Sequence, residues 1–151
     1  MLSALFHNYV LICSLLGWTI AQLIKTVRAS LHDGKINYER MFGAGGMPSG
    51  HSATVTALVV STLRRCGAAS PELAIAVVVA AVVIYDAMGV RRAAGEQAKV
   101  INRIVDINNT DDDDSNDIES DRLKESLGHT PLEVLGGIAL GIVIPFVIPM
   151  H

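Results

Sequence analysis

Residues 4–24 read ALFHNYVLICSLLGWTIAQLI and contain no Asp, Glu, Lys or Arg. Residues 73–85 and 130–150 are similarly rich in apolar side chains. A helix that crosses a membrane needs roughly 20 apolar residues, with a rise of about 1.5 Å per residue. The first and last segments are long enough, and the middle one is long enough if it continues to Val90. The sequence therefore predicts an integral membrane protein.

The same pattern predicts an all-α fold, a membrane helical bundle with about four apolar helices in one domain, residues 1–151. A loop at about residues 107–119, which includes Asp111 to Asp114, is too polar and too negatively charged to join a core, so we expect it to be mobile. The helices are expected over residues 4–29, 51–65, 71–90 and from 130 onward, with an amphipathic extension over 91–105.

The second helix determines the topology. From His51 to Arg65 it extends only about 22 Å, which is less than a hydrocarbon core of roughly 30 Å. If it spans, ten of the twelve Lys and Arg residues share one face, and only Arg64 and Arg65 lie opposite. Basic residues accumulate in cytoplasmic loops. The shared face is therefore expected on the cytoplasmic or equivalent organelle side, with His51, Arg91 and His129 at the same surface.

The segment Pro48-Ser49-Gly50-His51 opens this short helix. The first backbone N–H groups of a helix have no partner within the helix, and the helix dipole makes this end positive. Helix N-termini therefore bind anions readily. A flexible loop, a hydroxyl and an imidazole at this position favour an anion-binding site.

Asp86 lies near the end of the third apolar segment, and Arg91 and Arg92 follow within two helical turns. An ionisable group close to the membrane is costly unless it is paired. Arginine can hold two phosphate oxygens at once. Two interpretations remain open: phosphate-binding arginines, or a basic anchor beside the membrane in which Asp86 is the local ion-pair partner.

The segment Gly128-His129-Thr130-Pro131-Leu132-Glu133 opens the last helix. Thr130 at the N-cap, Pro131 at the first helical position and Glu133 three residues after the cap form the pattern of a capping box. Closing the helix start is therefore a sufficient explanation for Glu133. Capping does not explain His129, which stands just before the helix beside its positive end. A capped helix start beside a histidine would also suit phosphate binding, so the capping and phosphate-binding interpretations can hold together.

Two histidines suit phosphoryl transfer through a covalent intermediate, because one can attack phosphorus while the other protonates the leaving oxygen. Cations and backbone N–H groups can stabilise the other phosphate oxygens. His51, His129 and Glu133 could instead bind a metal, but the sequence offers no clear further ligand. Neither a metal nor a cofactor is expected.

The Pro-Ser-Gly-His segment matches the central motif of the type 2 phosphatidic acid phosphatase and vanadium haloperoxidase superfamily. Together with the segments around residues 86–98 and 128–134, it resembles the short divergent membrane branch of that superfamily. This resemblance covers most of the chain outside the acidic loop. It implies that His129 is the nucleophile, Glu133 the carboxylate that orients it and His51 the general acid.

The resemblance also implies that Ser49 and Gly50 help to bind phosphate. The first motif of the superfamily, a Lys followed seven residues later by Arg-Pro, is absent from this sequence. On physical grounds, Lys25, Arg91 and Arg92 are candidates to replace its cations.

The predicted function is metal-independent hydrolysis of a phosphomonoester or pyrophosphate, on a lipid or isoprenoid, through a phosphohistidine intermediate. The lipid is inferred from the membrane setting alone. The alternative is a catalytically inactive structural or lipid- or anion-binding subunit of a larger membrane complex. The expected partners are membrane lipid and a phosphorylated substrate, and no nucleic acid.

Overall fold

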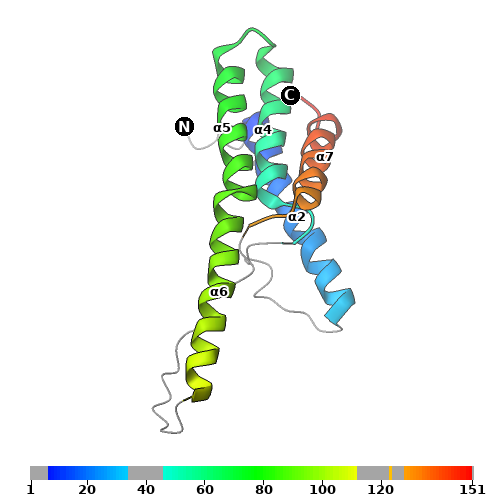
Figure 1. Ribbon diagram of the computed structural model, residues 1–151. Coiled ribbons are helices and arrows are strands. Elements are labelled where there is room, and N and C mark those ends of the chain that lie inside the picture. The colour runs from blue at the N-terminus through cyan, green and yellow to red at the C-terminus, as the bar shows by residue number, and fades with distance from the viewer. Residues whose placement is uncertain (1–6, 34–45, 112–122, 124–127, 151) are drawn as a thin grey trace.

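The computed structural model describes residues 7–33, 46–111, 123 and 128–150 (Figure 1). All regular secondary structure in these ranges is helical, which confirms the predicted fold class. The helices are α2 (Tyr9–Asp33), α4 (Gly50–Cys66), α5 (Pro71–Met88), α6 (Val90–Asp111) and α7 (Pro131–Val147).

The helix boundaries follow local signals in the sequence. Ser49, Ser70 and Thr130 are the N-caps of α4, α5 and α7, and each side chain accepts a hydrogen bond from a backbone N–H of the first turn. Such caps satisfy N–H groups that have no partner within the helix. The three helix starts therefore lie within a residue or two of their predicted positions.

Helix α4 is the centre of the bundle, and α2, α5 and α7 each pack along it (Figure 1). Small residues allow this close packing. A Cβ atom at Gly141 of α7 would lie 2.6 Å from the backbone oxygen of Ala53, and one at Gly17 of α2 would lie 3.0 Å from the same oxygen. Glycines spaced four residues apart, as Gly137 and Gly141 are, are typical of close helix contacts in membranes.

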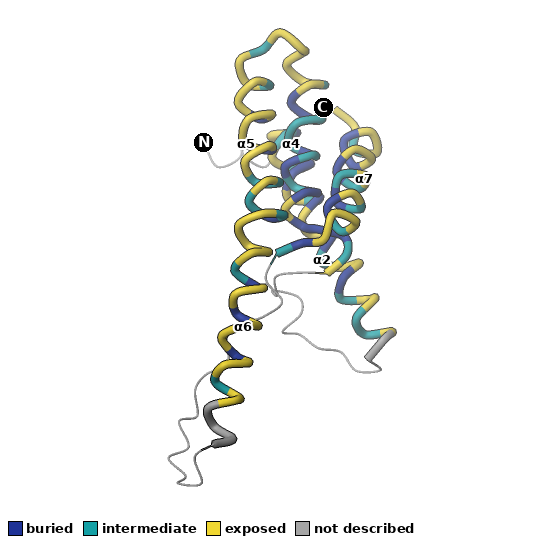
Figure 2. Tube along the Cα trace, in the orientation of Figure 1, coloured by how far each residue is buried: buried dark blue, intermediate teal, exposed yellow. Residues whose placement is uncertain are grey.

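Two helical segments are long and apolar enough to cross a membrane: Tyr9–Leu31 in α2, and Pro71–Ile107, which runs through α5 and α6. Pro131–Val147 is a shorter apolar helix. The outer side of α5 exposes large apolar side chains, such as Val78 at 62% and Val82 at 64% (Figure 2). A surface of this kind is suited to contact with lipid.

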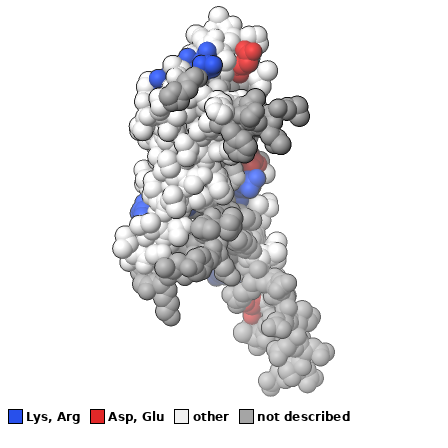
Figure 3. Space-filling view, turned by 180° about the vertical axis from the view of Figure 1, so that it is seen from behind, with Lys and Arg blue, Asp and Glu red and all other residues white. Residues whose placement is uncertain are grey.

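Charged groups gather at the ends of the bundle, and much of the helical surface seen in Figure 3 is uncharged. At the end far from His51, the Arg64 guanidinium donates a hydrogen bond to the Tyr9 hydroxyl at 2.8 Å, and that hydroxyl donates to the Pro145 carbonyl at 2.5 Å. The guanidinium also lies 4.7 Å from the centre of the Phe146 ring. This polar cluster ties α2, α4 and α7 together.

The end of helix α6 differs from expectation. Helix α6 continues to Asp111, so the beginning of the predicted mobile loop is helical. The rest of that loop, residues 112–119, lies outside the described residues, as do residues 4–6 of the first predicted helix. A helix can continue into a polar sequence because its backbone hydrogen bonds do not require an apolar face.

Candidate active site

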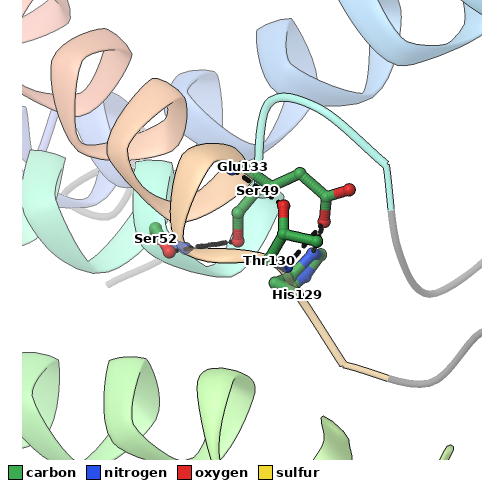
Figure 4. Close-up of polar contacts among 5 residues, drawn as sticks. All are labelled: Ser49, Ser52, His129, Thr130 and Glu133. Carbon is green, nitrogen blue, oxygen red and sulfur yellow. Dashed lines mark hydrogen bonds and ion pairs between the residues drawn. The ribbon is translucent and has the colours of Figure 1, made fainter.

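The N-termini of α4 and α7 meet at one end of the bundle (Figure 4). The backbone N–H of Ser49 donates to the backbone oxygen of Glu133 at 2.9 Å. The Ser49 hydroxyl accepts from the N–H of Ser52 at 3.3 Å and from the Ser52 hydroxyl at 3.0 Å, and both serines are fully buried. In this structure Ser49 therefore holds the two helix starts together, and its hydroxyl is occupied by the cap.

Glu133 combines the two functions that the sequence left open. The complete capping box is present: the Thr130 hydroxyl accepts from the N–H of Glu133, and Oε2 of Glu133 accepts from the N–H of Thr130 at 3.2 Å. The same Oε2 lies 3.1 Å from Nδ1 of His129 (Figure 4). A carboxylate at Nδ1 favours the tautomer with a proton on Nδ1, which leaves Nε2 with a free lone pair.

His129 is buried, with 4% of its surface exposed. Its backbone N–H donates to the carbonyl of Ala87 at 2.9 Å, which ties the segment before α7 to the end of α5. The preceding Gly128 has φ +86°, and a Cβ atom there would lie 2.5 Å from the backbone nitrogen of Arg92. Only glycine allows both this backbone conformation and this close approach.

The two imidazoles lie close together, with 5.9 Å between the ring centres of His51 and His129 and an angle of 59° between the ring planes. The predicted meeting of the two histidines at one end of the bundle is confirmed. The two arginines that follow α5 make different contacts. Nε of Arg91 binds Oδ2 of Asp86 at 2.7 Å, as in the local ion-pair interpretation, whereas the Arg92 backbone lies against the segment that carries His129.

Lys25 reaches the site from α2, where its surface is only 9% exposed, and the side chain packs against Gly46 in the loop before α4. A buried lysine near the Glu133 carboxylate and the His51 imidazole is a suitable partner for an anion. The structure therefore brings Lys25, Gly50, His51, His129 and Glu133 to one end of the bundle.

Gln22 was not predicted from the sequence. Its Nε2 lies 3.5 Å from the position of a Cβ atom on Gly50, and Trp18 covers the same glycine. The Oε1 atom is buried and has no hydrogen-bond partner among the residues that the structure describes. An unpaired buried acceptor costs about 1–3 kcal/mol, so Gln22 is a candidate ligand-binding residue. The only signal in the sequence is the spacing of residues 18, 22 and 25 on one face of α2.

His51 lies at the N-terminus of α4, outside the two candidate spans. Desolvation lowers the pKa of its imidazole from the usual 6.5, and the positive charges of Arg91, His129 and Lys25 lower it further, while Asp86 raises it. A phosphate bound beside the ring would raise the pKa again, because an adjacent negative charge favours the imidazolium. His51 is therefore suited to become an acid when an anion binds. Within the described part of the chain, no group of three His, Cys, Asp or Glu residues could hold a metal ion.

The fold and this site define a helical membrane protein with a two-histidine centre between helix N-termini. Residues 6–144 match the model of the divergent PAP2 family, and the chain belongs to that family. It is 37% identical to the uncharacterized membrane protein YuiD of Bacillus subtilis (strain 168), over 95% of this chain and 96% of the relative. None of the solved structures gives a significant match.

Proposed function

We propose that this protein is a membrane phosphatase that hydrolyses a phosphomonoester or pyrophosphate on a lipid or isoprenoid through a phosphohistidine intermediate. The observation that carries the proposal is the pairing of the His129–Glu133 contact at 3.1 Å with the His51 ring 5.9 Å away. Among the described residues, a carboxylate orients one imidazole and none orients the other. This asymmetry suits one nucleophile and one proton donor.

In the first step, Nε2 of His129 attacks phosphorus and the bond from phosphorus to the leaving oxygen breaks. The imidazolium of His51 gives its proton to that oxygen, so the alcohol or phosphate leaves in protonated form. In the second step, water attacks phosphorus, His51 takes a proton from it, and the N–P bond breaks. Phosphate leaves and His129 returns to its starting state.

The electrostatic support for this reaction comes from the surrounding helices. The free N–H groups at the start of α4, the ammonium of Lys25 and the guanidinium of Arg91 can offset charge on the phosphate oxygens. The amide of Gln22 lies over the same helix start, and its buried Oε1 can accept a hydrogen bond from the attacking water or from a protonated phosphate oxygen. Fixed donors of this kind stabilise a transition state without reorganisation.

A lipid substrate is supported by the setting of Trp18. Its indole contacts the position above Gly50 and is 41% exposed on the outside of α2. Tryptophan is favoured at the boundary between apolar chains and water. A phosphorylated head group at Gly50 would therefore have its apolar tail beside the apolar surface of α2.

The proposal is tested with purified protein in vesicles, supplied with phosphatidate or an isoprenyl pyrophosphate in the presence of a chelator. We expect release of inorganic phosphate, and acid-labile, base-stable phosphate on the protein after rapid quenching. The control is the double variant His51→Ala, His129→Ala. If the unmodified protein releases no phosphate from lipid or soluble substrates but binds them, the anion-binding subunit is the correct interpretation.

The pKa of His51 predicts a particular pH dependence. Because this pKa is below 6.5 in the free protein, kcat/KM should fall with rising pH already under about 6.5, as the acid loses its proton. Bound phosphate raises the pKa, so kcat should fall only at higher pH. The measurement is a pair of pH profiles for the protein and for His51→Ala. A descending limb that survives in the variant belongs to the substrate or to another group and would contradict this assignment.

A further inference from the structure

Gln22 in α2 has a buried atom with an unused capacity for hydrogen bonding. Among the residues that the structure describes, its Oε1 is the only buried side-chain nitrogen or oxygen without a hydrogen-bond partner. The great majority of buried polar side-chain atoms in folded proteins have such a partner, either in the protein or in bound water. The exception therefore indicates that Oε1 receives its hydrogen bond from a group that enters the site.

Gln22 lies beside residues of the candidate active site. Its Nε2 lies 3.5 Å from the position of a Cβ atom on Gly50, the residue before His51. Lys25 is three residues further along the same face of α2, and its charge interacts with those of His51 and Glu133. The amide of Gln22 therefore lies at the helix start that carries the imidazole of the proposed acid and base.

The two steps of the proposed reaction differ in one hydrogen atom. In the first step, the leaving oxygen is bonded to phosphorus and to the rest of the substrate, and it receives one proton from His51. In the second step, the attacking oxygen belongs to water and carries two hydrogens. His51 takes one of them, so the other needs a separate acceptor. A buried acceptor such as Oε1 of Gln22 suits that hydrogen and has no counterpart in the first step.

We propose that Gln22 is the positioning residue for the water that hydrolyses the phosphohistidine, an inference that rests on the proposed function. Its Oε1 accepts a hydrogen bond from one O–H of the water while His51 removes the proton of the other. The water oxygen forms a bond to phosphorus, and the N–P bond breaks with its electron pair returning to Nε2 of His129. The hydrogen that Gln22 holds remains on the phosphate that leaves.

An amide oxygen suits this position better than a carboxylate. The Glu133 carboxylate already contacts His129. The Asp86 carboxylate binds Arg91. A full negative charge at the position of Gln22 would also repel the phosphate oxygens, whereas an amide oxygen is a neutral acceptor. Holding the water in one orientation reduces the entropy that is lost when it attacks.

The partition of the phosphohistidine between water and methanol tests this role. Methanol carries a carbon atom where water has its second hydrogen, so its attack does not use Oε1. The unmodified protein and Gln22→Leu are supplied with phosphatidate in vesicles in the presence of methanol, and methyl phosphate and inorganic phosphate are measured. We expect Gln22→Leu to raise the ratio of methyl phosphate to inorganic phosphate about tenfold, because one hydrogen bond is lost only in the attack by water. More phosphate should also be trapped on the protein.

Thr26→Val is the matched control. Thr26 lies one turn from Gln22 and is half-buried like it, and its hydroxyl donates to the Gln22 backbone oxygen at 2.9 Å. This variant should leave the ratio unchanged. Gln22→Glu keeps an acceptor oxygen, so it should return the ratio toward the original value even though its charge weakens substrate binding.

Thermal melting separates this role from a role in packing alone. Gln22→Leu should melt at the same or a higher temperature, because an apolar group replaces an unpaired buried acceptor. A lower melting temperature with an equal loss of transfer to water and to methanol would overturn the proposal. So would an unchanged ratio while phosphohistidine forms normally. A failure of the unmodified protein to form phosphohistidine would instead overturn the proposed function, and the role of Gln22 with it.

Discussion

Replacing His129 with alanine is expected to reduce hydrolysis by at least about 10³-fold, because the attacking nitrogen is removed. The Glu133 carboxylate would remain, 3.1 Å from where Nδ1 had been. The measurement is single-turnover release of phosphate, together with phosphate trapped on the protein. In the variant, neither should be detectable above the rate in water.

His129 is more than a residue beside a helix cap, because its side chain is 4% exposed and its removal leaves a cavity. Some loss of stability is therefore expected, of the order of 1–3 kcal/mol. Chemical rescue separates the two effects. Imidazole added to His129→Gly or His129→Ala should enter the cavity and restore phosphate release without phosphate on the protein. A variant that melts at a much lower temperature and is not rescued would indicate a structural role.

The capping box provides a matched control for this prediction. Thr130→Ala removes the hydroxyl that accepts from the Glu133 N–H but leaves the contact between Glu133 and His129, so it should cost about 1 kcal/mol of stability and little rate. Glu133→Gln should do the opposite, because the amide can still accept from Thr130 but carries no charge to orient and stabilise the imidazole. The reverse result would show that Glu133 only closes the helix.

Gly137→Ala is expected to disrupt the contact between the starts of α7 and α4. Its Cβ would clash with the backbone oxygen of Ser49 and lie 2.9 Å from Cβ of Ser52. A backbone atom at a buried helix start cannot move aside, so α7 must separate from α4. We expect a loss of about 1–3 kcal/mol in stability, larger than the gain of roughly 1 kcal/mol that alanine brings to a helix.

The same change should also reduce activity. The hydrogen bond from the Ser49 N–H to the Glu133 oxygen holds the start of α4 against the start of α7, and these starts carry His51 and His129. The control is Gly136→Ala in the next position. Its Cβ would meet the terminal methyl of Met47 at 3.2 Å, a flexible group that can move. Melting temperature and hydrolysis should fall for Gly137→Ala and stay near the original values for Gly136→Ala.

Features that depend on neighbouring residues could be predicted from the sequence. Apolar segments of sufficient length indicated membrane helices. The Pro-Ser-Gly-His segment and Thr130 marked the starts of α4 and α7, because a cap acts within three residues of its own position. The pairing of His129 with Glu133 was implied by the resemblance to the superfamily motif, and the structure places the two side chains in contact. The polar sequence beyond residue 106 was less informative, because α6 continues through it to Asp111.

How these local features combine became evident from the packing of the helices. His51 and His129 are 78 positions apart and lie together because α4 and α7 both begin at one end of the bundle, in contact through glycines whose role no local pattern reveals. Gln22 could not be recognised from the sequence for the same reason. Only the packing of α2 against α4 shows that its side chain lies beside the start of α4. Long-range packing depends on the shapes of the helix surfaces that come into contact on folding. These shapes cannot be read from the types of individual residues.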